Sequence, residues 1–105
     1  MAFGLSEHTI NKLINIFDGN NQVEEAILFG SRAKGNYREG SDIDITLKGK
    51  NLTLKTLKTI EVQIDNLFLP YEVNLVLFNY ITNPLLIEHI ERVGISIYNT
   101  KVAKG

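Results

Sequence analysis

Two acidic residues separated by one apolar residue, Asp42 and Asp44, are the part of this chain best suited to chemistry. The stretch that contains them, 42–47, alternates polar and apolar residues, which predicts a strand with one face in the core. Side chains two residues apart on a strand point to the same side, so the two carboxylates would stand together, with Cα atoms roughly 6–7 Å apart. Like charges so placed repel unless a cation lies between them, and oxygen ligands of this kind suit Mg²⁺ that is shared with substrate phosphates. The pair therefore predicts a magnesium site, which could hold two ions about 4 Å apart.

The loop before these acids has the features of an anion-binding turn. The apolar run 26–29 predicts a short buried strand that ends at Gly30, where the backbone can turn sharply. Ser31 is a good cap for a short helix, and the free N–H groups at such a start favour an anion such as phosphate. Arg32 and Lys34 add positive charge to the same loop. The loop is therefore predicted to bind phosphate.

The order of these features is more specific than any one of them. A Gly-Ser step is common in turns and a D-x-D pair is common on solvated strand edges, so each alone is more often structural. The run Gly30-Ser31-Arg32, then Gly35, then Ser41-Asp42-Ile43-Asp44 resembles the motif of the nucleotidyltransferase superfamily of the DNA polymerase beta type. The short chain is similar to the minimal members of that superfamily, the stand-alone antitoxin-like (MNT) nucleotidyltransferases. The resemblance covers nearly the whole chain.

This resemblance implies a nucleotidyltransferase that uses Mg²⁺ and a nucleoside triphosphate, with ATP as the expected donor. In the superfamily the Gly-Ser loop holds the phosphates, and two Mg²⁺ ions lie on three carboxylates, two from the D-x-D strand and one from a neighbouring strand. Carried over by position, the catalytic and metal-binding residues are Asp42 and Asp44, and the nucleotide-binding residues are Gly30, Ser31, Arg32, Lys34 and Ser41. For Arg32 and Lys34, a solvated loop cation is an equal alternative.

The third carboxylate is missing. Its position, on the predicted strand 71–78, is held by Asn74. The amide oxygen can bind Mg²⁺, but the amide has no charge and cannot take up the acceptor's proton. We therefore expect nucleotide binding through Asp42 and Asp44 to survive, a weakly bound second ion, and an uncertain rate of transfer. Glu72 faces the same side of this strand and could assist, although surface exposure is the simpler reading.

The resemblance also implies a partner. In the minimal members the acceptor is often an all-helical HEPN-type ribonuclease toxin, which is silenced by binding or by transfer of AMP onto a tyrosine. Two functions stay open: an antitoxin that transfers AMP to such a partner, and a catalytically weak or inactive nucleotide-binding module that neutralises the partner by binding, which Asn74 favours. Transfer to a small molecule such as an aminoglycoside is a third, which the lack of an acceptor domain disfavours. A homo- or hetero-oligomer is compatible with each.

Size and composition indicate one domain, 1–105, with a single small core. The 44% hydrophobic and 22% charged fractions are those of an ordinary soluble globular protein. A net charge of −1 gives no general attraction to nucleic acid, so no long nucleic-acid footprint is expected. The chain has no cysteine, which excludes disulfides and thiol catalysis and fits a cytoplasmic location. No apolar run approaches the ~20 residues that cross a membrane, and no secretory signal is recognisable.

Hydrophobic spacing predicts the elements that must position the site. Helices are predicted after Ser6, after Thr53 as far as Pro70, and from Asn83 to Gly94. With the strands 26–29, 42–47, 71–78 and 95–98, the order is helix, strand, short helix, strand, helix, strand, helix, strand. This order predicts an α/β (α+β) fold, a small mixed sheet with helices packed on it, and the resemblance implies a polymerase-beta palm-like architecture. The tail 99–105 is expected to be frayed.

Side chains of the later helices carry two further expectations. Phe68 is expected to complete the inward stripe of the helix that follows Thr53. His89, which has Glu88 and Glu91 nearby, is expected to be an exposed residue of the last helix, with metal binding as the alternative. Tyr37 is expected to pack on its own loop, with stacking on a base as the alternative.

Overall fold

Side-chain caps fix where the longer helices begin. In the computed structural model, which describes residues 2–103, α1 (Glu7–Asp18), α3 (Leu54–Asp65) and α4 (Pro84–Val93) follow Ser6, Thr53 and Asn83. Each cap side chain accepts a hydrogen bond from an N–H of the first turn, which would otherwise lack an intrahelical partner. The predicted starts of these helices are therefore confirmed.

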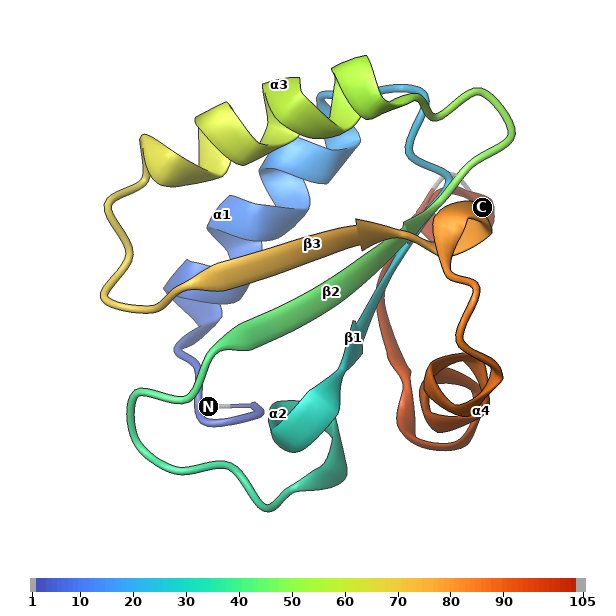
Figure 1. Cartoon of the computed structure of the whole chain (residues 1–105). Helices are drawn as coiled ribbons and strands as arrows, with labels where there is room; N and C mark the ends of the chain where they lie inside the picture. Colours follow the sequence, from blue (N-terminus) through green and yellow to red (C-terminus); the bar gives the residue numbers. More distant parts are fainter. Residues whose placement is uncertain (1, 104–105) are drawn as a thin grey trace.

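The described part of the chain contains a four-stranded sheet in the order β3-β2-β1-β4 (Figure 1). The strands are β1 (Glu25–Phe29), β2 (Ile43–Lys48), β3 (Val73–Leu77) and β4 (Ile95–Asn99). β1 is antiparallel to both β2 and β4, whereas β2 and β3 are parallel. A parallel pair needs a crossover connection, and α3 supplies it. The predicted mixed sheet with helices packed on it is confirmed.

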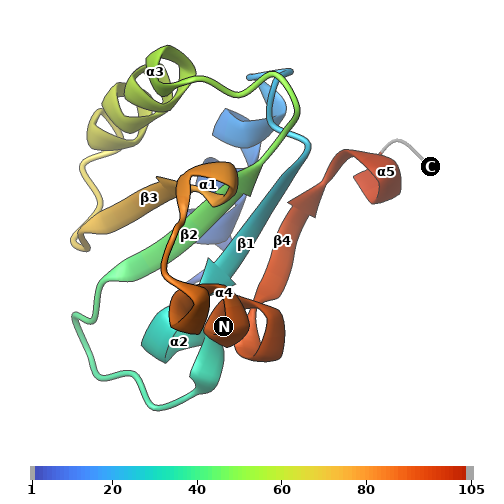
Figure 2. The ribbon, with the colours of Figure 1, turned by 45° about the vertical axis from the view of Figure 1, so that its right-hand side comes forward.

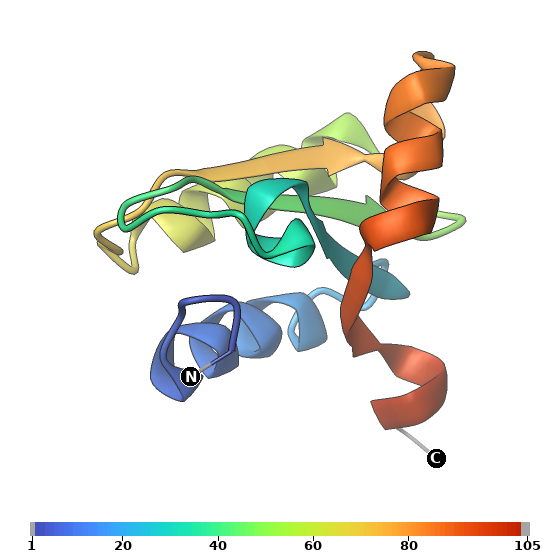
Figure 3. The same ribbon diagram turned by 90° about the horizontal axis from the view of Figure 1, so that it is seen from below.

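The two faces of the sheet differ in what covers them. Leu13 and Phe17 of α1 and Ile60 and Ile64 of α3 pack in one core cluster with the alternate apolar residues of the strands. On the other face, the short helix α2 (Gly30–Lys34) lies beside α4, near the end of β1 (Figures 2 and 3). The polar side chains of β2 face this second side, because strand residues alternate in direction.

The end of α3 differs from the prediction. The helix stops at Asp65 with Asn66 as its cap, well before Pro70. Phe68 then adopts a left-handed backbone conformation (φ 52°) and is 86% exposed, so its predicted place in the inward stripe is wrong. Pro70 disfavours a helical conformation only for Leu69, so the earlier end of the helix goes with the bend of the chain toward β3. Leu67 and Leu69 stay packed against the core.

The C-terminal segment also differs from the prediction. β4 extends to Asn99, and Thr100–Ala103 form a short helix, α5. The Thr100 N–H donates to the carbonyl of Glu24 at 2.9 Å, which anchors this segment beside β1. The segment predicted to fray thus contains the end of β4 and a short helix, and 104–105 lie outside the described residues. Among the residues described, no helix combines the length and the apolar character needed to cross a bilayer.

The Tyr98 hydroxyl links β4 to the end of α1. It donates to Asp18 Oδ1 at 3.0 Å, and the ring is 7% exposed. Burial, the hydrogen bond to Asp18 and the charge of Asp18 raise the pKa of Tyr98 above its ordinary value of 10.0. The phenol therefore stays protonated in the folded chain at a pH where the unfolded chain ionises, and folding loses stability as the pH rises above about 10.

We expect Tyr98→Phe to lower the free energy of unfolding by about 1 kcal/mol at neutral pH. The variant should also lose stability less steeply than the wild type between about pH 9.5 and 11. Urea unfolding followed by circular dichroism at both pH values measures this. Tyr80→Phe is the matched control, because Tyr80 is 59% exposed. Equal slopes for wild type and Tyr98→Phe would contradict the assignment.

Candidate active site

The two acidic residues of the D-x-D pair lie at the start of β2, on the sheet face that bears α2 and α4. Asp44 belongs to β2 and pairs with Phe29 on β1 and with Asn74 on β3. Asp42 precedes the strand, which begins one residue later than predicted. Asp42 is exposed and Asp44 is half-buried. The structure therefore brings the two predicted metal ligands and Asn74 to one place.

Asn74 bridges the two carboxylates. Its Nδ2 donates to Asp42 Oδ2 at 3.2 Å and to Asp44 Oδ1 at 3.0 Å. Ionised carboxylates only accept hydrogen bonds, so the amide nitrogen is the atom that suits this position. The two N–H dipoles partly offset the repulsion between the acids. The amide oxygen, which the sequence predicted as a metal ligand, would reach the same place only after the amide rotates.

Gly30 lies directly against the Asp44 carboxylate. Its φ is +74°, a conformation that favours glycine, and a Cβ at this position would collide with Asp44 Oδ2. The following Ser31 is half-buried in the first turn of α2. The predicted phosphate loop and the predicted metal ligands are thus neighbours in space.

Arg32 does not face the site as a free cation. Its side chain is 2% exposed, and Nε and Nη2 donate to the carbonyl of Ser41 at 3.0 and 2.8 Å, while Nη1 donates to the carbonyl of Phe3 at 2.8 Å. The guanidinium also lies over the rings of Tyr37 and Tyr71, at 5.3 and 4.8 Å from their centroids. The alternative of a solvated loop cation is therefore wrong, because Arg32 is buried and ties α2 to the loop before Asp42. Its contact with phosphate stays a prediction.

Ser41 has hydrogen-bond partners within the chain, whereas Lys34 is exposed. The Ser41 hydroxyl accepts from the Arg38 N–H at 2.8 Å, which shapes the turn that leads into Asp42. Its carbonyl accepts from Arg32, so both oxygens of Ser41 have structural partners. Lys34 is exposed at the end of α2, and its contact with phosphate stays a prediction.

His89 is a neighbour of the site that the sequence reading missed. It is half-buried on α4, so the expectation of a fully exposed surface residue is wrong. Its Nε2 accepts a hydrogen bond from the Gly30 N–H at 3.1 Å. The helical spacing contained a signal, because His89 is three residues after Leu86 and four before Val93, at the edge of the buried stripe.

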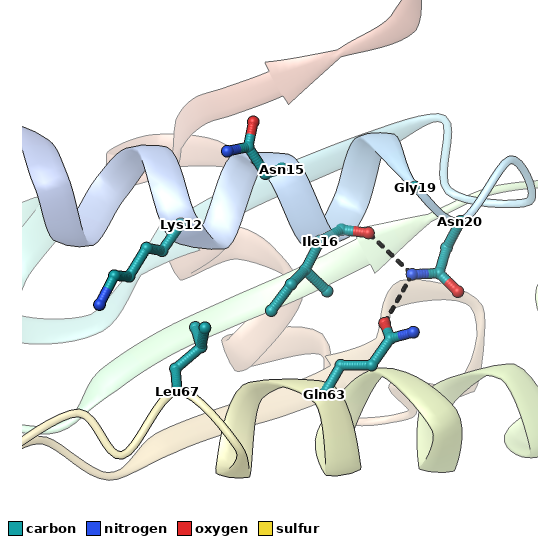
Figure 4. A pocket seen from close by; sticks show the side chains of 7 residues that line it. All are labelled: Lys12, Asn15, Ile16, Gly19, Asn20, Gln63 and Leu67. Carbon is teal, nitrogen blue, oxygen red and sulfur yellow. Dashed lines mark hydrogen bonds between the residues drawn. The ribbon is translucent and has the colours of Figure 1, made fainter.

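A pocket of about 380 Å³ lies between α1 and α3, on the face of the sheet away from the acids (Figure 4). It is lined by Lys12, Asn15, Ile16, Gly19, Asn20, Gln63 and Leu67. The Asn20 amide donates to the carbonyl of Ile16 at 2.7 Å and to Gln63 Oε1 at 2.9 Å, which ties the end of α1 to α3. None of the predicted site residues lines this pocket.

A Gly-Ser turn beside paired acids on a mixed sheet defines a nucleotidyltransferase type of domain. The family described as polymerase beta, nucleotidyltransferase, matches residues 11–102, and the chain belongs to it. The comparison with curated proteins found no match.

Solved structures show the same fold. One is a toxin–antitoxin complex with AMP-PNP, with a TM-score of 0.71, 22% identity, and coverage of 90% of this chain and 76% of that chain. Another is tri-AMPylated Shewanella oneidensis HEPN toxin in complex with MNT antitoxin, with a TM-score of 0.69, 19% identity, and coverage of 95% of this chain and 77% of that chain. A third is the toxin–antitoxin MntA-HepT, with a TM-score of 0.68, 19% identity, and coverage of 93% and 76%.

The family implies magnesium, and the donor set of this site fits such an ion. Asp42 and Asp44 offer the oxygen ligands that Mg²⁺ prefers, and their common contact with one amide group shows that they converge. Within residues 2–103 no group of three His, Cys, Asp or Glu side chains is placed to hold a metal ion. The pair therefore fits an ion that takes its remaining ligands from water and substrate phosphates.

We expect Gly30→Ala to lower stability more than Gly35→Ala. Both glycines have positive φ, +74° and +94°, so backbone strain lowers the free energy of unfolding of either alanine variant by about 1 kcal/mol. Only the Cβ at Gly30 collides with Asp44, which should add about 1–3 kcal/mol, whereas nothing lies within 4 Å of a Cβ at Gly35. Thermal unfolding of both variants measures the difference. Equal losses would contradict the close approach of Gly30 to Asp44.

Proposed function

We propose that the chain is a Mg²⁺-dependent nucleotidyltransferase antitoxin that transfers AMP from ATP to a HEPN-type helical partner protein. The observation that carries the proposal is the position of Gly30 against Asp44, beside Asp42. It supports the assignment of the loop to phosphate and of the two acids to Mg²⁺. Membership in the nucleotidyltransferase family supports the proposal. It is also supported by the similar structures, one a complex with AMP-PNP and one a complex with AMPylated HEPN toxin. The setting we propose is cytoplasmic, in a hetero-oligomer with the partner.

The proposal assigns a role to each residue. Gly30 makes the turn that brings Ser31 to the β- and γ-phosphates, because its own N–H already donates to His89. Lys34 and Ser41 lie close enough in sequence to assist. Asp42 and Asp44 hold Mg²⁺, which when bound would offset phosphate charge. The partner's hydroxyl oxygen forms a bond to the α-phosphorus, the bond from this phosphorus to pyrophosphate breaks, and the hydroxyl proton passes to solvent. Catalysis of such a transfer depends mostly on positioning and on neutralisation of charge.

A second candidate function is favoured by one specific observation. Asn74 holds both carboxylates through hydrogen bonds and cannot accept the proton of an attacking hydroxyl. A site of this kind can bind a nucleotide and still transfer it slowly. The alternative is therefore a nucleotide-binding module that neutralises its partner by covering it.

The double variant Asp42→Asn, Asp44→Asn separates these functions. With radiolabelled ATP, Mg²⁺ and the purified HEPN-type partner, the wild type should label the partner, and the double variant should label it about 100-fold less or weaker still. The asparagines keep the size of the side chains and remove their charge. Equal labelling of the partner by both proteins would contradict the enzyme assignment. Formation of a complex without labelling would favour the binding module.

We expect Asn74→Asp to make the chain more dependent on magnesium. Without metal, the variant replaces two hydrogen bonds by a third negative charge, which should cost about 1–2 kcal/mol of stability. Added Mg²⁺ should raise its Tm more than that of the wild type, and transfer to the partner should become faster. Asn74→Ala is the control, since it removes the hydrogen bonds without adding charge. If added Mg²⁺ leaves the Tm of the Asn74→Asp variant unchanged, the result contradicts a metal site at this place.

A further inference from the structure

His89 makes a contact that the roles proposed so far leave unexplained. Its Nε2 accepts from the Gly30 N–H at 3.1 Å, although α4 lies 59 residues further along the chain. Its ring also meets the ring of Phe29 edge-on, with centroids 6.3 Å apart and an interplanar angle of 80°. One side chain of α4 therefore contacts the last residue of β1 and the first residue of α2.

The direction of this hydrogen bond fixes the state of the imidazole. A backbone N–H donates only to a lone pair, so Nε2 carries no proton and the ring proton lies on Nδ1. The side chain acts here as a hydrogen-bond acceptor. An apolar side chain of similar size would fill the space and leave the half-buried N–H without its partner.

The contact gives Gly30 a second neighbour besides the Asp44 carboxylate. A Cβ on Gly30 would collide with Asp44 Oδ2, and the Gly30 N–H donates to His89 Nε2. The left-handed backbone of Gly30 is easily altered, because glycine adopts many conformations at little cost. A residue held on two sides loses that freedom before the ligand arrives, which lowers the entropic cost of binding.

The position of His89 is itself fixed by the packing of α4. Ile90 is 3% exposed, and a Cβ at Gly94 would come within 2.7 Å of Ile27 Cγ2 on β1. α4 is therefore packed closely over the residues that directly follow His89. The helix carries the imidazole to the phosphate loop on a rigid support.

We propose that His89 is a positioning residue of the phosphate loop: it binds the Gly30 N–H and so sets the direction in which Ser31 meets the phosphates. The inference rests on the proposed nucleotide site. His89 itself does not touch the substrate. His89 contributes by shaping the loop, so its substitution should change the affinity for nucleotide.

Affinity for a non-hydrolysable ATP analogue with Mg²⁺ tests the proposal by isothermal titration. His89→Leu should raise Kd about three- to tenfold, which is the loss of one hydrogen bond, whereas His89→Gln should stay within about twofold of wild type, because its amide oxygen can accept from Gly30. The chain has one other histidine, His8, which is exposed on α1, and His8→Leu is the matched control with unchanged Kd. Circular dichroism confirms that each variant is folded.

A second readout needs no variant and no ligand. In ¹⁵N-labelled wild type, the ring nitrogens of His89 at neutral to mildly alkaline pH should show the tautomer protonated at Nδ1. A proton on Nε2 would overturn the proposal, and so would a His89→Leu variant that binds the analogue as tightly as wild type; in both cases the nucleotide site would stand. A wild type that binds no analogue would instead overturn the proposed function, and the role of His89 with it.

Discussion

The register of β1 against β2 is the constraint on which the site depends. Phe29 pairs with Asp44, so the residue that follows Phe29 must turn beside the Asp44 carboxylate. A side chain there would collide with Oδ2, and Gly30 is the residue that avoids the collision. A slip of one residue would move Asp44 to the core face and bring an isoleucine to the loop. Antiparallel pairing thus converts two motifs that are separate in sequence into one site.

The parallel pairing of β2 with β3 then determines the charge of that site. It puts Asn74 opposite Asp44, where a third carboxylate would face two others. The amide instead donates to both acids, so the polar groups satisfy one another within the chain. This arrangement lowers the repulsion that a bound cation would otherwise relieve. Asparagine in place of a third carboxylate therefore stabilises the metal-free state. It also reduces the free energy that binding of a metal ion would release.

Local signals were sufficient for most of the fold and for part of the site. Caps such as Ser6 and the alternation of residues 42–47 act over a few residues, and the element order and the mixed sheet followed from them. Phe68 was misplaced because the exit from α3 depends on how the chain returns to the sheet. The burial of Arg32 was missed because a buried cation and a solvated one look the same in sequence. His89 was missed because its contact joins two elements that only tertiary packing brings together.

The burial of Arg32 has a consequence for the form in which a nucleotide can enter. Its charge lies within the fold, between two tyrosine rings and two backbone carbonyls, whereas the acids at the site face outward beside the loop. A triphosphate is strongly anionic, and its repulsion from two carboxylates a few ångströms away would amount to several kcal/mol at the effective dielectric constant of a protein surface. Exposed Lys34 is too strongly screened to offset this alone. For the nucleotide site that we propose, the charge balance therefore favours entry of the nucleotide together with its cation rather than as the bare anion.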